Sequence, residues 1–376
     1  MRRLAAIAIL VLATLTACSD DKADKPQPLD DWTMIDVSPA EPVTLTAHDN
    51  QLLLGLRHRG AKVVPELMLY DSTGKRTPVA VKPNPASPYA FEAIWYSIAY
   101  DGKQLLALGG AAGGAHSNTR WTVWTGTPQT GLVEHPQNFW TFGGQTAGDL
   151  FSAVRTPSGG ALLGTWGGVQ TGNDAMVWLP QSDGKWVRQD PTKTALQSTP
   201  SLLVGPGFGT TLGDSILLVG SQVRLGGGKV AQGAAVWRST KLNQGWSRIE
   251  LPEPGNRSQA NTATCSTTGC VLSGYVDGQL AIWQLDASGT AKRLAGVPSI
   301  PVGDKDKLPA PIVTDGKVVQ IVAQDNKVKV LTGQDGKWTV QESTGGPAGP
   351  VTDALLTPEH KLYLIAGASL WETNLS

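Results

Sequence analysis

The sequence predicts an all-β protein, and more specifically a seven-bladed β-propeller made of four-stranded antiparallel blades. A segment that reads apolar, aromatic, polar turn and often tryptophan recurs along the chain. Copies spaced by roughly 40 to 60 residues are typical of propellers, in which each repeat forms one blade. The seven copies are LMLYDSTGK (67–75), TVWTGTPQTG (122–131), MVWLPQSDGKW (176–186), AVWRSTKLNQGW (235–246), AIWQLDASGT (281–290), KVLTGQDGKW (329–338) and SLWETN (369–374).

A second repeated signature places another strand of each blade just before these segments. Turn residues such as Asp-Asn, Asp-Gly and Gly-Asp precede nearly every copy, so we expect tight hairpins between the first and second strands. The copies are LLLGL (52–56), LLALGG (105–110), ALLGTW (161–166), ILLVGS (216–221), VLSGY (271–275), VQIVA (319–323) and LYLIAG (362–367).

The last blade ends after its third strand, so its fourth strand must come from elsewhere in the chain. Residues 32–35 (WTMI) resemble the fourth strands at 186–188, 246–249 and 338–340. We therefore expect an N-terminal strand to close the ring, which removes exposed sheet edges. Residues 32–376 would form a single propeller domain.

The composition agrees with a turn-rich β protein and argues against one class of partner. Glycine occurs 44 times and proline 25 times in 376 residues, as many turns require. The 31 basic and 31 acidic residues balance, and losing Arg2 and Arg3 with a signal peptide would keep the protein near neutral. Nucleic acid is therefore not expected as a partner.

Residues 1–17 are predicted to be a bacterial export signal. Arg2 and Arg3 precede an apolar stretch at 4–15 that is too short for a mature membrane span. The residues Leu15-Thr16-Ala17-Cys18 resemble the lipobox of bacterial lipoproteins. The resemblance implies that Cys18 is the lipid anchor of an extracytoplasmic, membrane-anchored protein. The alternative is an ordinary signal peptide cut near Ala17, with Cys18 incidental.

Residues 18–31 continue from the lipidated cysteine as a polar, charged and proline-bearing segment, SDDKADKPQPLDD after Cys18. Because this segment has little to bury, we expect a disordered tether.

Two cysteines remain, Cys265 and Cys270, separated by a turn sequence that contains Thr268-Gly269. An exported protein lies where disulfides persist, so we expect the pair to staple one hairpin. A metal site would need more soft ligands, and a redox-active pair would usually have Cys-x-x-Cys spacing.

The tryptophans at equivalent repeat positions are interpreted as packing residues between neighbouring sheets. They are Trp124, Trp178, Trp237, Trp283 and Trp371. The Asp-Gly-Lys-Trp copies that begin at Asp183 and Asp335 suit turns between third and fourth strands.

These Asp-Gly-Lys-Trp turns resemble degenerate forms of the Asp-box, the Ser/Thr-x-Asp-x-Gly-x-x-Trp/Phe repeat of sialidases and related propellers. The resemblance implies the propeller fold, and the family includes catalytic members as well as membrane-associated assembly factors. A weaker likeness, through residues 70–75 (YDSTGK), is to quinoprotein-like propellers of outer-membrane assembly lipoproteins.

The sequence does not carry a recognisable catalytic signature, and no cofactor is expected. The Phe/Tyr-Arg-Ile-Pro motif of sialidases is absent, as are Gly-x-Ser-x-Gly, His-Glu-x-x-His and a phosphate loop. A sialidase-like mechanism also needs an arginine cluster, an acid/base carboxylate and a tyrosine nucleophile.

The candidate binding surface lies at the connections between second and third strands, which share one face of a propeller. These connections are long in the first four blades and short in the last three, and such clustering predicts a binding face. An aromatic segment at 139–142 (FWTF), between the second and third blades, adds a platform for a sugar ring or a protein anchor. Alternatively, these aromatics cover the rim, and the two histidines are surface groups rather than metal ligands. The candidate residues are Arg57, His58, Arg59, His116, Asn118, Arg120, Trp140, Trp166, Asn173, Asp174 and Arg224.

We expect a lipid-anchored propeller that binds a cell-envelope protein or a glycan without catalysis. The alternative is a sialidase-like glycoside hydrolase or lyase with Asp149, Asp174 or Glu134 as candidate carboxylates. A structural spacer without a binding site is the third possibility.

Overall fold

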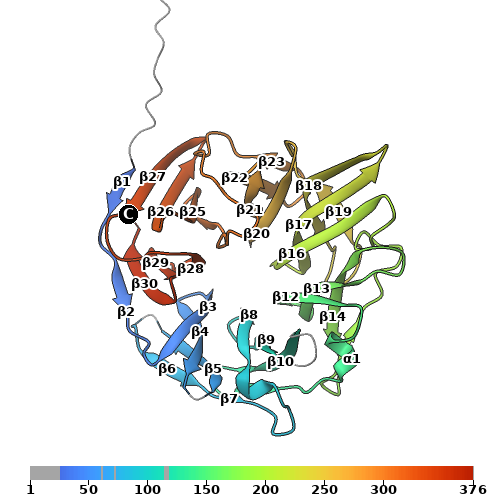
Figure 1. Cartoon of the computed structure of the whole chain (residues 1–376). Helices are drawn as coiled ribbons and strands as arrows, with labels where there is room; N and C mark the ends of the chain where they lie inside the picture. Colours follow the sequence, from blue (N-terminus) through green and yellow to red (C-terminus); the bar gives the residue numbers. More distant parts are fainter. Residues whose placement is uncertain (1–25, 61, 72, 114–117, 376) are drawn as a thin grey trace, which may run out of the picture.

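The chain forms a ring of seven β-sheets around a central opening (Figure 1). This computed structural model describes residues 26–60, 62–71, 73–113 and 118–375. The predicted signal peptide, Cys18 and His116 lie outside the described residues. The prediction of a seven-bladed propeller is confirmed.

In each sheet, four antiparallel strands follow one another in order from the central axis outwards. The first three blades are β3 (Ala40–His48), β4 (Gln51–Arg59), β5 (Val63–Tyr70) and β6 (Arg76–Val79); β8 (Ile94–Tyr100), β9 (Leu105–Ala112), β10 (Thr119–Thr127) and β11 (Gly131–Glu134); and β12 (Ala147–Thr156), β13 (Gly159–Gly167), β14 (Asn173–Pro180) and β15 (Trp186–Arg188). The next two are β16 (Leu202–Leu212), β17 (Ser215–Gly226), β18 (Lys229–Arg238) and β19 (Ser247–Glu250); and β20 (Ser258–Ser266), β21 (Gly269–Val276), β22 (Gln279–Asp286) and β23 (Ala291–Arg293). The last two contain β24 (Ile312–Thr314), β25 (Lys317–Gln324), β26 (Lys327–Gln334) and β27 (Lys337–Ser343); and β28 (Val351–Leu356), β29 (Lys361–Ala366) and β30 (Ser369–Asn374).

The N-terminal segment closes the ring, as the sequence predicts. Strand β2 (Thr33–Ile35) pairs antiparallel with β30 and supplies the fourth strand of the seventh blade. Just before it, β1 (Gln27–Leu29) pairs parallel with β27 on the outer edge of the sixth blade. The segment expected to be a tether therefore joins the sheet at its described end, where Leu29 packs against the core between the sixth and seventh blades. A second extra strand, β7 (Val81–Lys82), pairs parallel with β11 in the second blade.

Seven hydrophobic clusters hold the ring together, one at each junction between neighbouring blades. Four of the repeated tryptophans, Trp124, Trp178, Trp237 and Trp283, have no exposed surface, and Trp371 packs half-buried in its cluster. Burying a large aromatic side chain contributes about 2 to 3 kcal/mol. The repeated tryptophans are thus packing residues, as expected.

The connections between second and third strands differ from the prediction in two blades. Two-residue turns follow β21, β25 and β29, and both central residues have positive φ, as in Asp277 (φ 49°) and Gly278 (φ 75°). The fourth blade has the same kind of turn at Gly227 and Gly228, so its expected long loop is an extended β17–β18 hairpin. The first blade likewise extends β4 and β5 into the predicted loop. Side chains that alternate between the two faces favour a longer paired hairpin over an irregular loop in both blades, and the glycine pair adds to this in the fourth blade.

Six of the innermost strands contain a bulge where the chain approaches the axis. In several blades, glycines in the adjacent second strand make room for the bulge. A Cβ at Gly220 would lie 2.1 Å from the carbonyl oxygen of Gly205, and one at Gly274 would lie 2.0 Å from that of Gln259. The glycine in the second-strand signature is therefore a packing requirement of the bulge.

The structure contains the expected disulfide between Cys265 and Cys270, which face each other across β20 and β21. Within the described residues, no helix has the length and apolar character needed to cross a membrane.

Candidate functional site

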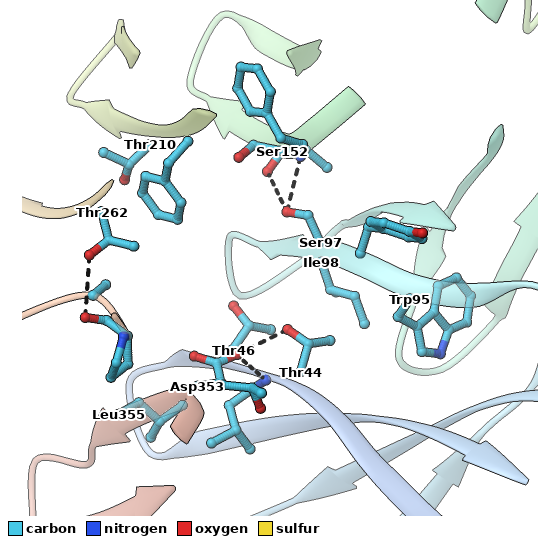
Figure 2. Close-up of a pocket in the computed structure, with 18 of the residues that line it drawn as sticks. Thr44, Thr46, Trp95, Ser97, Ile98, Ser152, Thr210, Thr262, Asp353 and Leu355 are labelled. Carbon is cyan, nitrogen blue, oxygen red and sulfur yellow. Dashed lines mark hydrogen bonds between the residues drawn. The ribbon is translucent and has the colours of Figure 1, made fainter. Parts of the chain in front are cut away.

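The innermost strands surround a channel with a volume of about 1040 Å³. Its wall is made by the first strands of six blades and by residues 306–310, which precede β24. Figure 2 shows hydroxyl groups on this wall, together with the ring of Trp95 and the carboxylate of Asp353. The channel lining therefore mixes hydroxyl groups and backbone with apolar side chains such as Ile98 and Leu355.

Hydroxyl groups at the bulges connect neighbouring blades across the channel wall. Ser97 Oγ accepts a hydrogen bond of 3.0 Å from the backbone amide of Ala153 (Figure 2). Ser152 Oγ accepts one of 3.0 Å from the amide of Gly209 in the next blade. These side chains accept hydrogen bonds from backbone amides of the innermost strand of the next blade, so we assign them a structural role.

Asp353 occupies the corresponding position in the seventh blade. Its carboxylate accepts hydrogen bonds from the amide of Leu45 and the hydroxyl of Thr44 in the first blade (Figure 2). Burial raises the pKa of Asp353 to about 6, and these hydrogen bonds oppose that rise because they favour the charged form. Asp353 is thus a titratable group in the channel wall that the sequence analysis did not select.

Exposed aromatic side chains gather around the second blade, on the face that carries the connections from second to third strands. Every large aromatic side chain that is exposed in the described residues lies here: Phe91 (46%), Tyr96 (49%), Phe139 (50%) and Trp140 (68%). Half-buried Tyr89 and Trp121 adjoin them. We call the six residues Tyr89, Phe91, Tyr96, Trp121, Phe139 and Trp140 the aromatic rim.

Arg120 connects two parts of the aromatic rim. Its guanidinium lies 5.2 Å from the ring centre of Phe139 and 5.9 Å from that of Tyr89. Such cation–π contacts hold the planar group against the rings and leave its donors available. Arg120 and Trp140, both predicted to be binding residues, therefore lie on one surface, although they belong to different connections between strands.

Local sequence explains why these rings are exposed. The short helix α1 (Phe139–Phe142) is capped by Asn138, whose side chain accepts a hydrogen bond of 3.0 Å from the amide of Trp140. Its Phe142 is buried against Trp178, which turns Phe139 and Trp140 outwards. The helix thus presents two aromatic rings on a short, anchored support.

Glycines bring the other rings close to the backbone of the second blade. A Cβ at Gly110 would lie 3.2 Å from Tyr96 and 3.3 Å from Trp121, whose rings stack edge to face. The 3-10 turn η1 (Ala90–Glu92) carries Phe91 and follows Tyr89. Sequence reasoning missed Tyr89, Phe91, Tyr96 and Trp121, although the run of prolines and aromatics at 83–96 was a usable signal.

The predicted residues of the first blade form an ion cluster rather than free donors. Arg57 and Arg59 both contact one carboxylate oxygen of Glu41, at 2.9 and 2.8 Å. His58 lies 3.3 Å from Glu66. Arg57 also lines the channel, so this cluster borders its mouth.

Other predicted residues point into the protein. Trp166 is 8% exposed, and the guanidinium of Arg188 lies 3.9 Å from its ring centre. Asp174 is 4% exposed, and its carboxylate accepts a hydrogen bond of 2.6 Å from the amide of Ser198. Burial raises the pKa of Asp174. Neighbouring Asn173 is exposed, and its backbone carbonyl accepts a hydrogen bond of 2.6 Å from the hydroxyl of Ser198.

The three candidate carboxylates do not share a surface. Glu134 is 5% exposed and accepts a hydrogen bond of 2.8 Å from the amide of Asn84. Asp149 is exposed near the start of β12, whereas Asp174 is buried as described. Asn118 is exposed beside Arg120, and Arg224 lies on the fourth blade. Within the described residues, no group of three or more His, Cys, Asp or Glu side chains could hold a metal ion.

Comparisons with known proteins identify the fold but not a family. No family model matches the sequence, and no curated protein matches it. The solved structure of streptogramin B lyase is similar, with a TM-score of 0.56 and 12% identity over 92% of this chain and 97% of that one. YCF48 bound to D1 peptide has a TM-score of 0.51 and 13% identity, over 93% and 98%. Polysaccharide lyase Uly1 has a TM-score of 0.51 and 11% identity, over 96% and 94%.

Proposed function

We propose that this chain is a lipid-anchored, extracytoplasmic binding or scaffold protein that recognises a cell-envelope protein or glycan through the aromatic rim. The observation that carries the proposal is the gathering of all exposed large aromatics of the described residues around the second blade, with Arg120 among them. Single exposed apolar residues are ordinary, but a contiguous aromatic group beside an arginine is typical of binding surfaces.

The likeness to YCF48 supports a binding role, since that propeller was solved with a peptide. The Asp-box resemblance is to propeller proteins that include non-catalytic members, and it is compatible with this role. Asp183 lies in the turn between β14 and β15, where its carboxylate accepts a hydrogen bond of 3.1 Å from the amide of Lys185.

A polysaccharide lyase or hydrolase is the second candidate, favoured by the similarity to two lyase structures. Glu134 and Asp174 are buried and bonded to backbone amides, so Asp149 is the one exposed carboxylate of the three candidates. Turnover of envelope polysaccharide by the purified protein, abolished by Asp149→Asn, would favour this candidate over the binding role.

The binding role is tested by the double change Phe139→Ala and Trp140→Ala. Both rings are largely exposed, so the substitutions should leave folding intact. We expect crosslinked capture from native membranes, and binding to a glycan array, to fall at least tenfold. Val313→Ala is the matched control, because Val313 is 45% exposed on the sixth blade, away from the aromatic rim.

Crosslinked capture and the glycan array distinguish a protein partner from a glycan. A captured protein lost in the rim variant supports a protein partner, and a glycan signal lost in it supports a sugar. Equal capture and equal glycan binding by both variants would remove the aromatic rim as the site. The lipid anchor is tested separately, because Cys18→Ala should move the protein from the membrane to the soluble fraction.

A further inference from the structure

A second concave site lies on the fourth blade, apart from the channel and the aromatic rim. It has a volume of about 520 Å³, within the range of small-molecule sites. The extended β17–β18 hairpin, the outer strand β19, the start of β16 and the connection before it supply its lining residues. These strands belong to the fourth blade of the ring (Figure 1). We call it the blade-4 pocket. Its polar lining residues are Thr199, Ser201, Arg224, Lys229 and Arg248.

The blade-4 pocket carries more positive than negative charge. Arg224 contacts Glu250, and the nearest nitrogen of Arg248 lies 3.9 Å from the same carboxylate. In the described part of the chain, Lys229 forms no ion pair. Three cations therefore share a single anion, unlike the compact cluster in which Glu41 contacts Arg57 and Arg59 at short range.

The two guanidiniums are close enough to affect each other. Partial burial lowers the pKa of Arg248, and the nearby charge of Arg224 lowers it further. The Arg248 side chain is 29% exposed, so its charge is partly withdrawn from water, and its nearest carboxylate oxygen, on Glu250, lies 3.9 Å away. A bound anion would relieve this repulsion and accept several charge-assisted hydrogen bonds.

Register explains how the fold assembles this arrangement. Arg224 faces Leu202 on one side and Ala231 on the other, while Arg248 lies opposite Trp237 on the same face of the sheet. The small Ala231 leaves the space that the arginine side chains border. Thr199 and Ser201 add hydroxyl groups, whose oxygens lie 3.4 Å apart, at the edge of the pocket.

We propose that the blade-4 pocket binds a tetrahedral oxyanion, a phosphate or sulfate group carried by a larger ligand. Two planar guanidiniums, one ammonium and two hydroxyls can supply donors from several directions, which suits a tetrahedral anion. The pocket extends beyond one such group, so the rest of the ligand contacts Leu202, Leu225 and Ala231.

The test is calorimetric titration of the purified protein with inorganic phosphate and with sulfate, at constant ionic strength set by chloride. We expect saturable binding that weakens at least tenfold in the double variant Arg224→Gln and Arg248→Gln. Glutamine removes the charge but keeps a polar group and most of the aliphatic stem of these partly exposed side chains, so the fold should survive, which circular dichroism checks. Lys292→Gln, at an exposed position on β23, removes a positive charge outside the blade-4 pocket and should bind as the unmodified protein does.

The ligand source is resolved by two further probes, glucose 6-phosphate and phosphatidylglycerol vesicles. Tighter binding of the soluble monoester supports a free or glycan-borne phosphate, and vesicle binding lost in the double variant supports a lipid headgroup. The proposal is overturned if neither anion binds saturably, or if the double variant binds as well as Lys292→Gln. Neither outcome alters the aromatic rim test, because the two surfaces use different blades.

Discussion

The carboxylate of Asp353 accepts a hydrogen bond of 2.7 Å from the backbone amide of Leu45, which joins the last blade of the propeller to the first. Two other blades make the equivalent bond with Ser97 and Ser152, which carry no charge. At the junction between the seventh and first blades, such an amide is therefore bound by a titratable carboxylate.

This junction should make stability depend on pH. Burial raises the pKa of folded Asp353 to about 6, above its usual value of 3.8. The folded state thus holds the proton more tightly, and the resulting stabilisation is complete below about pH 4 and is lost as the pH rises through 6. Relative to Asp353→Asn, the unmodified protein should lose up to about 3 kcal/mol of unfolding free energy between pH 4 and 7.

Urea unfolding of both proteins across this range measures the difference. Asparagine keeps an oxygen that can accept the bond from Leu45, so the comparison isolates the charge. Parallel stability curves for the two proteins would show that Asp353 does not titrate in this window.

The closing strand gives a second prediction through two adjacent residues. Ile35 packs against the core between the seventh and first blades, whereas Met34 is 56% exposed. Ile35→Ala should lower the unfolding free energy by about 1 to 2 kcal/mol, because a half-buried side chain is lost. Met34→Ala should change it by less than about 0.5 kcal/mol.

Thermal or denaturant unfolding distinguishes the two variants. Deleting residues 32–37 removes the whole strand and should destabilise the ring as a unit. An unchanged thermal midpoint after this deletion would mean that β2 does not contribute to ring closure in solution.

The sequence predicts the ring well because its repeat is both periodic and physically constrained. The tryptophan in five of the third strands must fill a junction, and glycines such as Gly220 and Gly274 in second strands must admit a bulge. The residues at 32–35 could be placed because they look like other fourth strands. Hairpin lengths are harder to predict from the sequence. Gly227 and Gly228 can lie in an irregular loop or form the turn of a paired hairpin, and only the strand pairing distinguishes the two.

The candidate site was less predictable, because polar residues near a rim serve both structure and binding. Asp174 and Glu134 bind backbone amides of neighbouring connections, which no local pattern reveals. Trp166 lies under Arg188, a contact between different strands of its blade. By contrast, Trp140 is exposed because the short helix α1 buries Phe142, and the aromatic segment FWTF that carries both residues is visible in the sequence.

The bulges of the inner strands lead to a third prediction, at glycines of the fourth blade. A Cβ at Gly220 would overlap the carbonyl of Gly205, so Gly220→Ala should cost about 3 kcal/mol through strain or loss of the bulge. Gly207 has open space around its Cβ position, and Gly207→Ala should change stability by less than about 0.5 kcal/mol. Denaturant unfolding compares them, and equal stabilities would contradict the close approach.

The fourth prediction concerns the disulfide between Cys265 and Cys270. The bond closes a loop with a sequence separation of only 5, so its effect on the unfolded chain is small, about 2 kcal/mol. Because the two residues also face each other in a paired ladder, the hairpin keeps its register when they are reduced. The double change to alanine should therefore lower the unfolding free energy by about 2 kcal/mol while the circular dichroism spectrum of the ring is retained. Global unfolding of this variant at room temperature would show instead that folding of the fifth blade depends on the disulfide.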